Sequence, residues 1–140
     1  RSALQECSRE QVVNSFDNTI LYTDHFLGQA IQWLKKSEAT AASAMLYVSD
    51  HGESLGENNL YLHGLPYRVA PDVQKRVPWI TWWSPQFEKQ MGLSRTCLQN
   101  KAQMPLTHDH YFHSVLGLLN VSTADYQAKL DVHADCRGKS

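Results

Sequence analysis

Only two segments of this 140-residue chain are predicted to form β-strands. Ala44 to Ser49 is a short, nearly continuous apolar run, typical of a strand buried on both faces in a parallel sheet covered by helices. Val77 to Trp83 is rich in β-forming residues, and Pro78 is expected at its start because proline cannot donate to a strand ladder. Since two strands do not make a stable sheet, the missing strands must come from residues outside this chain or from another chain.

The first helix is expected from about Arg9 to Lys36. Apolar residues recur there every three, four or seven positions, which predicts one apolar helix face. Ser8 and Gln11 fit a capping box at the start of this helix, with Ser8 as the N-cap residue.

A second helix is expected from about His108 to Leu119, after a cap at Thr107. Its apolar side consists of Phe112, Val115, Leu116 and Leu119. The signal is weak between residues 84 and 104 and ambiguous from 124 to 140. The expected order of elements is therefore helix, strand, long loop, strand and helix.

The charged residues are few and dispersed. Thirteen Lys and Arg balance fourteen Asp and Glu, which argues against a nucleic-acid partner or a basic membrane patch. No apolar stretch approaches the roughly 18–20 residues that span a bilayer, and the first residues lack the apolar core of a signal peptide. We therefore expect a chain that neither spans a membrane nor exports itself.

The strongest chemical signal is the pair Asp50 and His51, directly after the first predicted strand. Ligands of open α/β sheets bind beyond the carboxyl ends of strands, and carboxylate and imidazole are both good Zn²⁺ ligands. Both side chains serve one site only if the backbone turns there, which Gly52 would permit. His63, twelve residues on in a long glycine-punctuated loop, is a third metal-facing or phosphate-facing candidate. The alternative for Asp50 and His51 is a strand-end turn with a hydrogen-bonded histidine.

A second polar cluster opens the later helix. His108 and Asp109 are candidates for partners that orient a metal-ligating histidine through a hydrogen bond. The alternative is that they are surface residues at a helix start.

The three cysteines, Cys7, Cys97 and Cys136, leave two interpretations open. Cys97 and Cys136 could be joined, which would stabilise the fold by about 4 kcal/mol in the chain-entropy model and leave Cys7 without a partner in this chain. Alternatively, all three are buried free thiols.

The segment from Ser49 to Asn58, SDHGESLGEN, followed by YLHG at 61–64, closely resembles one family. It is similar to the phosphoethanolamine transferases that modify lipid A, including the mobile colistin-resistance enzymes. Further matches cover nearly the whole chain: CSREQ at 7–11, DNT at 17–19, YTD at 22–24, RVP at 76–78 and DCR at 135–137. Asn59 stands where many of these relatives have glycine, and asparagine tolerates the left-handed backbone.

This resemblance implies a portion of an alkaline-phosphatase/sulfatase-like α/β/α sandwich. Residues 1–140 would be the C-terminal part of a single catalytic domain at the periplasmic face of the inner membrane. The upstream part of that domain and its membrane anchor are absent from this chain, so the fragment would be inactive alone. The implied reaction is zinc-dependent transfer of phosphoethanolamine from phosphatidylethanolamine to a lipid A phosphate. It proceeds through a threonine that is not in this chain.

The resemblance also implies roles for particular residues. Asp50 and His51 match zinc ligands, and His63 matches a catalytic histidine that binds the substrate phosphate or a second zinc. Glu53 is a further candidate for orienting the ligands, together with His108 and Asp109. A disulfide is implied between Cys97 and Cys136, and one from Cys7 to an upstream cysteine. The alternatives are a sulfatase-type or phosphatase-type hydrolase of the same superfamily and a non-catalytic folded fragment.

Overall fold

The computed structural model describes residues 3–138. The chain divides into two compact units. Unit 1 consists of Arg1–Trp33 with Tyr47–Ile80, and unit 2 of Leu34–Leu46 with Thr81–Ser140. Within the described residues, no helix is both long enough and apolar enough to cross a membrane.

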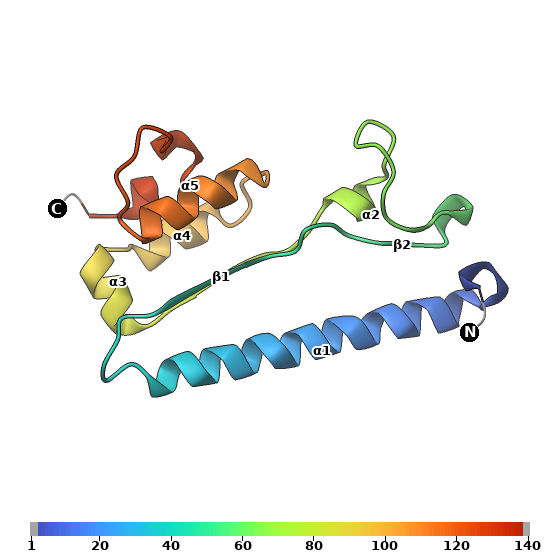
Figure 1. Cartoon of the computed structure of the whole chain (residues 1–140), viewed down its shortest axis with the longest axis horizontal. Helices are drawn as coiled ribbons and strands as arrows, with labels where there is room; N and C mark the ends of the chain where they lie inside the picture. The colour runs from blue at the N-terminus through green and yellow to red at the C-terminus, as the bar shows by residue number, and fades with distance from the viewer. Residues whose placement is uncertain (1–2, 139–140) are drawn as a thin grey trace. The chain divides into compact units, whose positions relative to one another are not determined.

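The first helix, α1, runs from Arg9 to Lys36, as the sequence predicts (Figure 1). The predicted capping box is present: Ser8 N–H donates to Gln11 Oε1 at 2.8 Å, and Gln11 N–H donates to Ser8 Oγ at 3.2 Å. These bonds occupy N–H groups that the first helical turn leaves without a backbone partner. Among the side chains of α1, only Val12 is buried, so most of the predicted apolar face is not covered by the described residues.

The two predicted strands form β1 (Ala44–Val48) and β4 (Trp79–Trp83), which pair in a two-stranded sheet. Ser84 N–H, just after β4, donates to Ser43 O, just before β1, at 2.9 Å. The two strands therefore run in opposite directions, and the expectation of a parallel arrangement is wrong for this pair. All five residues of β1 are partly exposed rather than buried on both faces, because the described chain supplies no further strand to this sheet.

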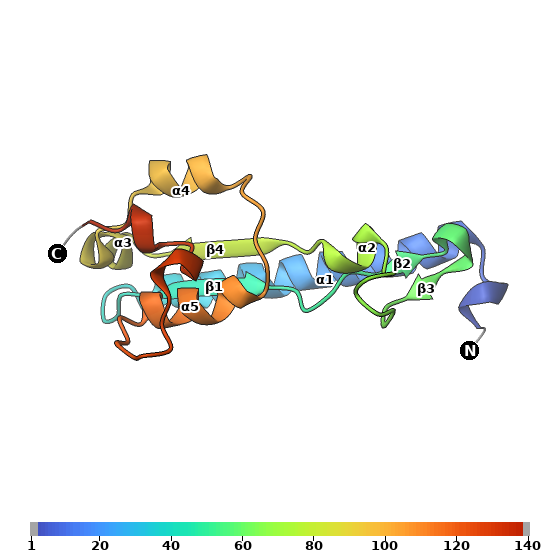
Figure 2. The same ribbon diagram turned by 90° about the horizontal axis from the view of Figure 1, so that it is seen from above.

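The long connection between these strands is more ordered than the sequence indicates. It contains a hairpin of β2 (Ser54–Leu55) and β3 (Tyr61–Leu62), followed by the short helix α2 (Asp72–Lys75) (Figure 2). The hairpin reverses through a 3-10 turn at Glu57–Asn59. Asn59 has φ +59°, so the expected left-handed backbone is confirmed at this position.

Unit 2 contains two helices that the sequence pattern did not reveal, α3 (Pro85–Met91) and α4 (Arg95–Lys101). A disulfide joins Cys97 of α4 to Cys136, which lies in a 3-10 turn at Ala134–Cys136. This confirms the pairing that the resemblance implies. Cys7 is a free thiol with no cysteine partner among residues 3–138.

The last helix, α5, spans Asp109–Leu118, but its buried face is not the predicted one. Phe112 and Leu119 are exposed, whereas His113, Ser114, Gly117 and Leu118 are buried. The reason is hydrogen bonding to the C-terminal segment. Gln127 N–H donates to His113 Nδ1 at 3.1 Å, and Val132 N–H donates to Ser114 Oγ at 3.0 Å.

Asp131 lies at the centre of this packed region and is almost completely buried. Its Oδ1 accepts from His133 N–H at 2.9 Å, and its Oδ2 accepts from the Tyr126 hydroxyl at 2.7 Å and from the Arg137 guanidinium. Arg137 also donates to Gly117 O at 2.6 Å. Burial opposes ionisation of Asp131, but His133 and the Tyr126 hydroxyl outweigh it, so the pKa of Asp131 is lowered.

Candidate metal centre

The candidate site lies in unit 1, where the chain leaves β1 and enters the β2–β3 hairpin. Asp50 and His51 follow β1, and Glu53 directly precedes β2. His63 directly follows β3, and the hairpin pairs Ser54 with Leu62. This register sets Glu53 and His63 side by side, although they are ten positions apart in the sequence.

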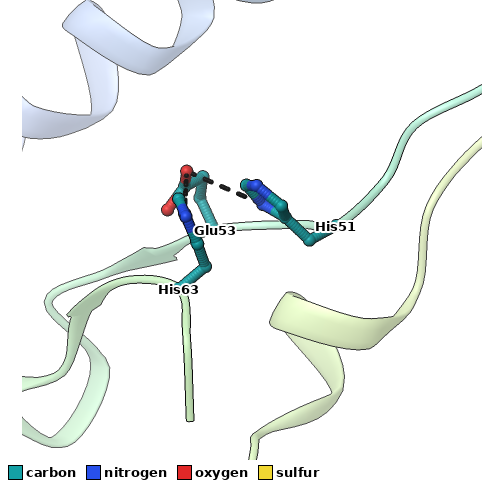
Figure 3. A group of neighbouring side chains, drawn as sticks. All are labelled: His51, Glu53 and His63. Carbon is teal, nitrogen blue, oxygen red and sulfur yellow. Dashed lines mark hydrogen bonds and ion pairs between the residues drawn. The ribbon is translucent and has the colours of Figure 1, made fainter.

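His51, Glu53 and His63 form a compact group of potential metal ligands (Figure 3). One donor atom from each lies within 4.8 Å of the others. His63 Nδ1 is 2.9 Å from Glu53 Oε1, and His51 Nδ1 is 3.9 Å from the same oxygen. The two imidazole rings are stacked, with their centroids 3.6 Å apart. Two imidazoles and a carboxylate are a donor set that suits Zn²⁺ and related divalent ions.

Asp50 lies at the other edge of the His51 ring. Its Oδ2 is 3.6 Å from His51 Nε2, and its Oδ1 accepts the backbone N–H of His51 at 3.1 Å. The carboxylate of Asp50 is largely exposed, with 87% of its side-chain area accessible. Asp50 and His51 are thus adjacent, as expected, whereas Asp50 is outside the three-residue group.

The second carboxylate oxygen of Glu53 tests whether these residues fit a cation. Its Oε2 is buried and has no hydrogen-bond partner among residues 3–138. A buried carboxylate oxygen without a donor is costly, and binding a cation is one way to remove that cost. The donor set and this oxygen therefore fit a metal ion.

Gly52 is needed for a different reason from the expected one. Its φ is not positive, so the turn after β1 does not require a left-handed backbone there. Instead, Gly52 N–H donates to Gln74 O at 3.0 Å, and a Cβ at position 52 would overlap the backbone carbonyl of Val73. The close approach of two backbones holds His51 and Glu53 against α2.

An open pocket of about 730 Å³ adjoins the group of ligands. Asp50, His51 and Glu53 line one part of it, and Phe16 and Ile20 of α1 line another. The helix side of the pocket is therefore mixed, because Thr19 and Thr23 of α1 line it together with these two apolar side chains.

The remaining predicted residues lie in unit 2. Asp109 Oδ2 accepts from the Thr107 hydroxyl at 3.3 Å, at the start of α5. His110 Nδ1 accepts the backbone N–H of Thr107 at 3.1 Å. The role expected for His108 and Asp109 stays a prediction.

The sequence predicts that Glu53 only orients the ligands, whereas the structure places it within the group of potential ligands. In extended backbone, side chains two residues apart point to the same side. His51 and Glu53 have this spacing, whereas Asp50 and His51 do not, so the spacing itself could have indicated that His51 and Glu53 share a site.

The sequence profile of the Sulfatase family matches residues 2–121, and the chain belongs to this family. Within it, the chain is 44% identical over 135 residues to phosphoethanolamine transferase EptA of Salmonella typhimurium, covering 96% of this chain and 25% of that protein. It is 43% identical over 122 residues to phosphatidylethanolamine transferase Mcr-1 of Escherichia coli, covering 87% of this chain and 21% of that one. The chain thus spans about a quarter of the length of these relatives.

Solved structures agree with this relationship. The soluble domain of lipooligosaccharide phosphoethanolamine transferase A from Neisseria meningitidis superposes with a TM-score of 0.94 at 41% identity, covering 99% of this chain and 42% of that domain. The integral membrane form of the same enzyme gives a TM-score of 0.91 at 43% identity, covering 96% of this chain and 25% of that one. The resemblance to this group of transferases and the sulfatase-like α/β fold are confirmed.

Proposed function

We propose that residues 1–140 are the C-terminal part of the catalytic domain of a lipid A phosphoethanolamine transferase. The parent protein would work at the periplasmic face of the inner membrane, with the rest of the domain and a membrane anchor upstream. Identity above 40% over most of the chain to named phosphoethanolamine transferases supports this proposal. The single observation that carries it is the group His51, Glu53 and His63 at the end of β1, with a buried carboxylate oxygen that lacks a donor.

In this proposal, His51 and Glu53 of this group hold a zinc ion, and the exposed carboxylate of Asp50, next to His51, supplies a further ligand. Zinc would lower the pKa of a bound hydroxyl and stabilise negative charge on the transferring phosphoryl group. His63 is held at Nδ1 by Glu53, so its Nε2 is the ring nitrogen left for a phosphate oxygen of the donor. The nucleophilic threonine would come from the upstream part of the domain.

The proposed substrates are phosphatidylethanolamine as donor and a lipid A phosphate as acceptor. Both classes occur in the names of relatives: one is a phosphatidylethanolamine transferase, and another is a Kdo(2)-lipid A phosphoethanolamine 7''-transferase that is 31% identical. The second candidate function is hydrolysis of a simple phosphate or sulfate ester, which the match to the Sulfatase family favours.

The test uses the full-length parent protein in membranes containing phosphatidylethanolamine and lipid A. We expect Asp50→Asn and His51→Ala to lower transfer by about a hundredfold or more, since even outer partners of metal ligands contribute about 10–100-fold. Asp125→Asn, at an exposed position in unit 2, should leave transfer unchanged. Mass spectrometry of lipid A measures the added phosphoethanolamine.

Full transfer by either site variant would contradict the proposed site. Release of free phosphate or sulfate from simple esters, with no change in lipid A, would favour the hydrolase. A wild-type protein that neither binds metal nor turns over any ester would leave only a non-catalytic fold.

A further inference from the structure

The loop that follows the candidate site displays apolar side chains to solvent. We call residues 62–69 the 62–69 loop; it begins at the last residue of β3, leads toward α2 and projects on the side of unit 1 away from α1 (Figure 1). Leu62, Leu65, Tyr67 and Val69 are all exposed, Tyr67 to 78% and Val69 to 66%. These four side chains lie within eight residues and are not covered by any of residues 3–138, and clusters of this kind mark interaction surfaces.

The apex of this loop is a defined turn. The backbone N–H groups of Val69 and Ala70 both donate to Pro66 O, at 2.9 and 3.0 Å, and Ala70 is buried. Tyr67, Arg68 and Val69 therefore stand at the tip of a hydrogen-bonded turn whose end is anchored in unit 1.

The chemistry of the apex suits a phospholipid surface. No acidic residue lies between Glu57 and Asp72, and Arg68 is exposed at the tip. Lys75 Nζ lies 5.3 Å from the centre of the Tyr67 ring and 3.6 Å from Asp72 Oδ1, so Arg68 is the cation at the tip and Lys75 is shared with a carboxylate. Tyrosine and aliphatic side chains enter the boundary between headgroups and acyl chains, while arginine and lysine attract anionic headgroups.

The loop begins at the site itself. His63 and the tip residue Tyr67 are four positions apart, so they can be separated by at most about 14 Å. Apolar anchors of this kind enter the interface by about 5–10 Å. A tip seated in the interface would keep His63 near the plane of the phosphates.

We propose that the 62–69 loop docks on the phospholipid surface and holds the candidate site at the level of the headgroups. This inference rests on the proposed function only in taking a lipid as donor, because membrane docking can be measured without turnover.

The test uses the complete soluble domain of the parent protein, since a relative's soluble domain has been crystallised by itself. The double variant Tyr67→Ser/Val69→Ser is compared with Leu119→Ser/Val121→Ser, which removes two exposed apolar side chains from unit 2. Binding is measured by flotation with vesicles of phosphatidylethanolamine and phosphatidylglycerol. We expect the loop variant to partition about tenfold less than wild type, and the control variant to match wild type.

Turnover supplies the second readout. For the loop variant, kcat/KM with phosphatidylethanolamine in vesicles should fall about tenfold through KM, while kcat/KM with a water-soluble phosphoethanolamine ester stays within about twofold. Tyr67→Trp/Val69→Leu should restore both vesicle binding and vesicle turnover.

Equal flotation of wild type and the loop variant, or no flotation of wild type, would overturn the proposal. A loop variant with a lower Tm and reduced turnover of both esters would also overturn it, because the loop would then pack against the upstream part of the domain. If wild type binds vesicles through the loop but turns over neither ester, docking stands and the proposed function fails.

Discussion

The two units each contain a carboxylate with a buried oxygen, and the surroundings of the two carboxylates differ. Asp131 in unit 2 has donors at both oxygens, from His133 N–H, the Tyr126 hydroxyl and Arg137. Glu53 in unit 1 has its Oε1 beside two imidazoles, while its buried Oε2 has no donor among residues 3–138.

This contrast separates a structural role from a functional one. A buried carboxylate with all of its partners stabilises a fold, and removing it leaves buried donors without an acceptor. A buried carboxylate that lacks a partner is a liability to the fold, and its retention is understandable if a ligand completes it. The predictions below change one carboxylate at a time.

The largest effect is expected for Asp131→Ala. This substitution leaves Arg137 and the Tyr126 hydroxyl without their acceptor, so the free energy of unfolding should fall by about 3–5 kcal/mol. Urea denaturation of the complete soluble domain measures the change. Asp125→Ala, at an exposed position, should stay within about 0.5 kcal/mol of wild type. A loss below about 1 kcal/mol for Asp131→Ala would show that the cluster contributes little.

Glu53→Gln should weaken zinc binding and leave stability almost unchanged, the opposite of what is expected for Asp131→Ala. The amide keeps the size of the side chain but removes the charge, so zinc affinity should fall by about 10–100-fold. The free energy of unfolding of the metal-free domain should change by less than about 1 kcal/mol. Competition with a chromophoric chelator gives the affinity, with Glu10→Gln at an exposed position as control. Unchanged zinc affinity would remove Glu53 from the metal centre.

The smallest expected effect is a pH dependence of stability from Asp131. The pKa of this group is lower in the folded chain than its ordinary value of 3.8. Its stabilisation is therefore complete above pH 3.8 and is lost as pH falls through the lower pKa of the folded state. Denaturation between about pH 6 and pH 2.5 should show this loss in wild type and a flatter profile in Asp131→Asn. Parallel profiles would mean that other carboxyl groups, such as Glu88 with its lowered pKa, dominate the acid sensitivity.

The long helix and the two main strands were predictable because their signals are local. The bounds of α1 follow from apolar periodicity and from the capping box at Ser8. The helices α3 and α4 were missed, although each begins after a serine whose side chain caps it, Ser84 and Ser94. Gly92, with φ +60°, ends α3 and was a further sign. At seven residues each, these helices are too short for periodicity, so only their caps could have revealed them.

The buried face of α5 was not predictable from hydrophobicity. His113 and Ser114 are buried because they accept N–H groups of the chain near residues 127 and 132, which are distant in sequence. Similarly, the residues after β1 identified Asp50, His51 and His63 as candidates, but the pairing of Glu53 with His63 depends on the register of the β2–β3 hairpin. The sequence motifs thus identified the candidate residues, whereas contacts between segments distant in sequence determine which of these residues lie next to one another.

The contact between Gly52 and the carbonyl of Val73 has a consequence for how this protein can change. The obstacle to a side chain at position 52 is a main-chain carbonyl, so changes in neighbouring side chains cannot make room for one. Variation can therefore exchange the donor groups on either side more easily than the residue between them. A library randomised at position 52 should therefore return glycine almost exclusively, even under selection for a new metal or substrate.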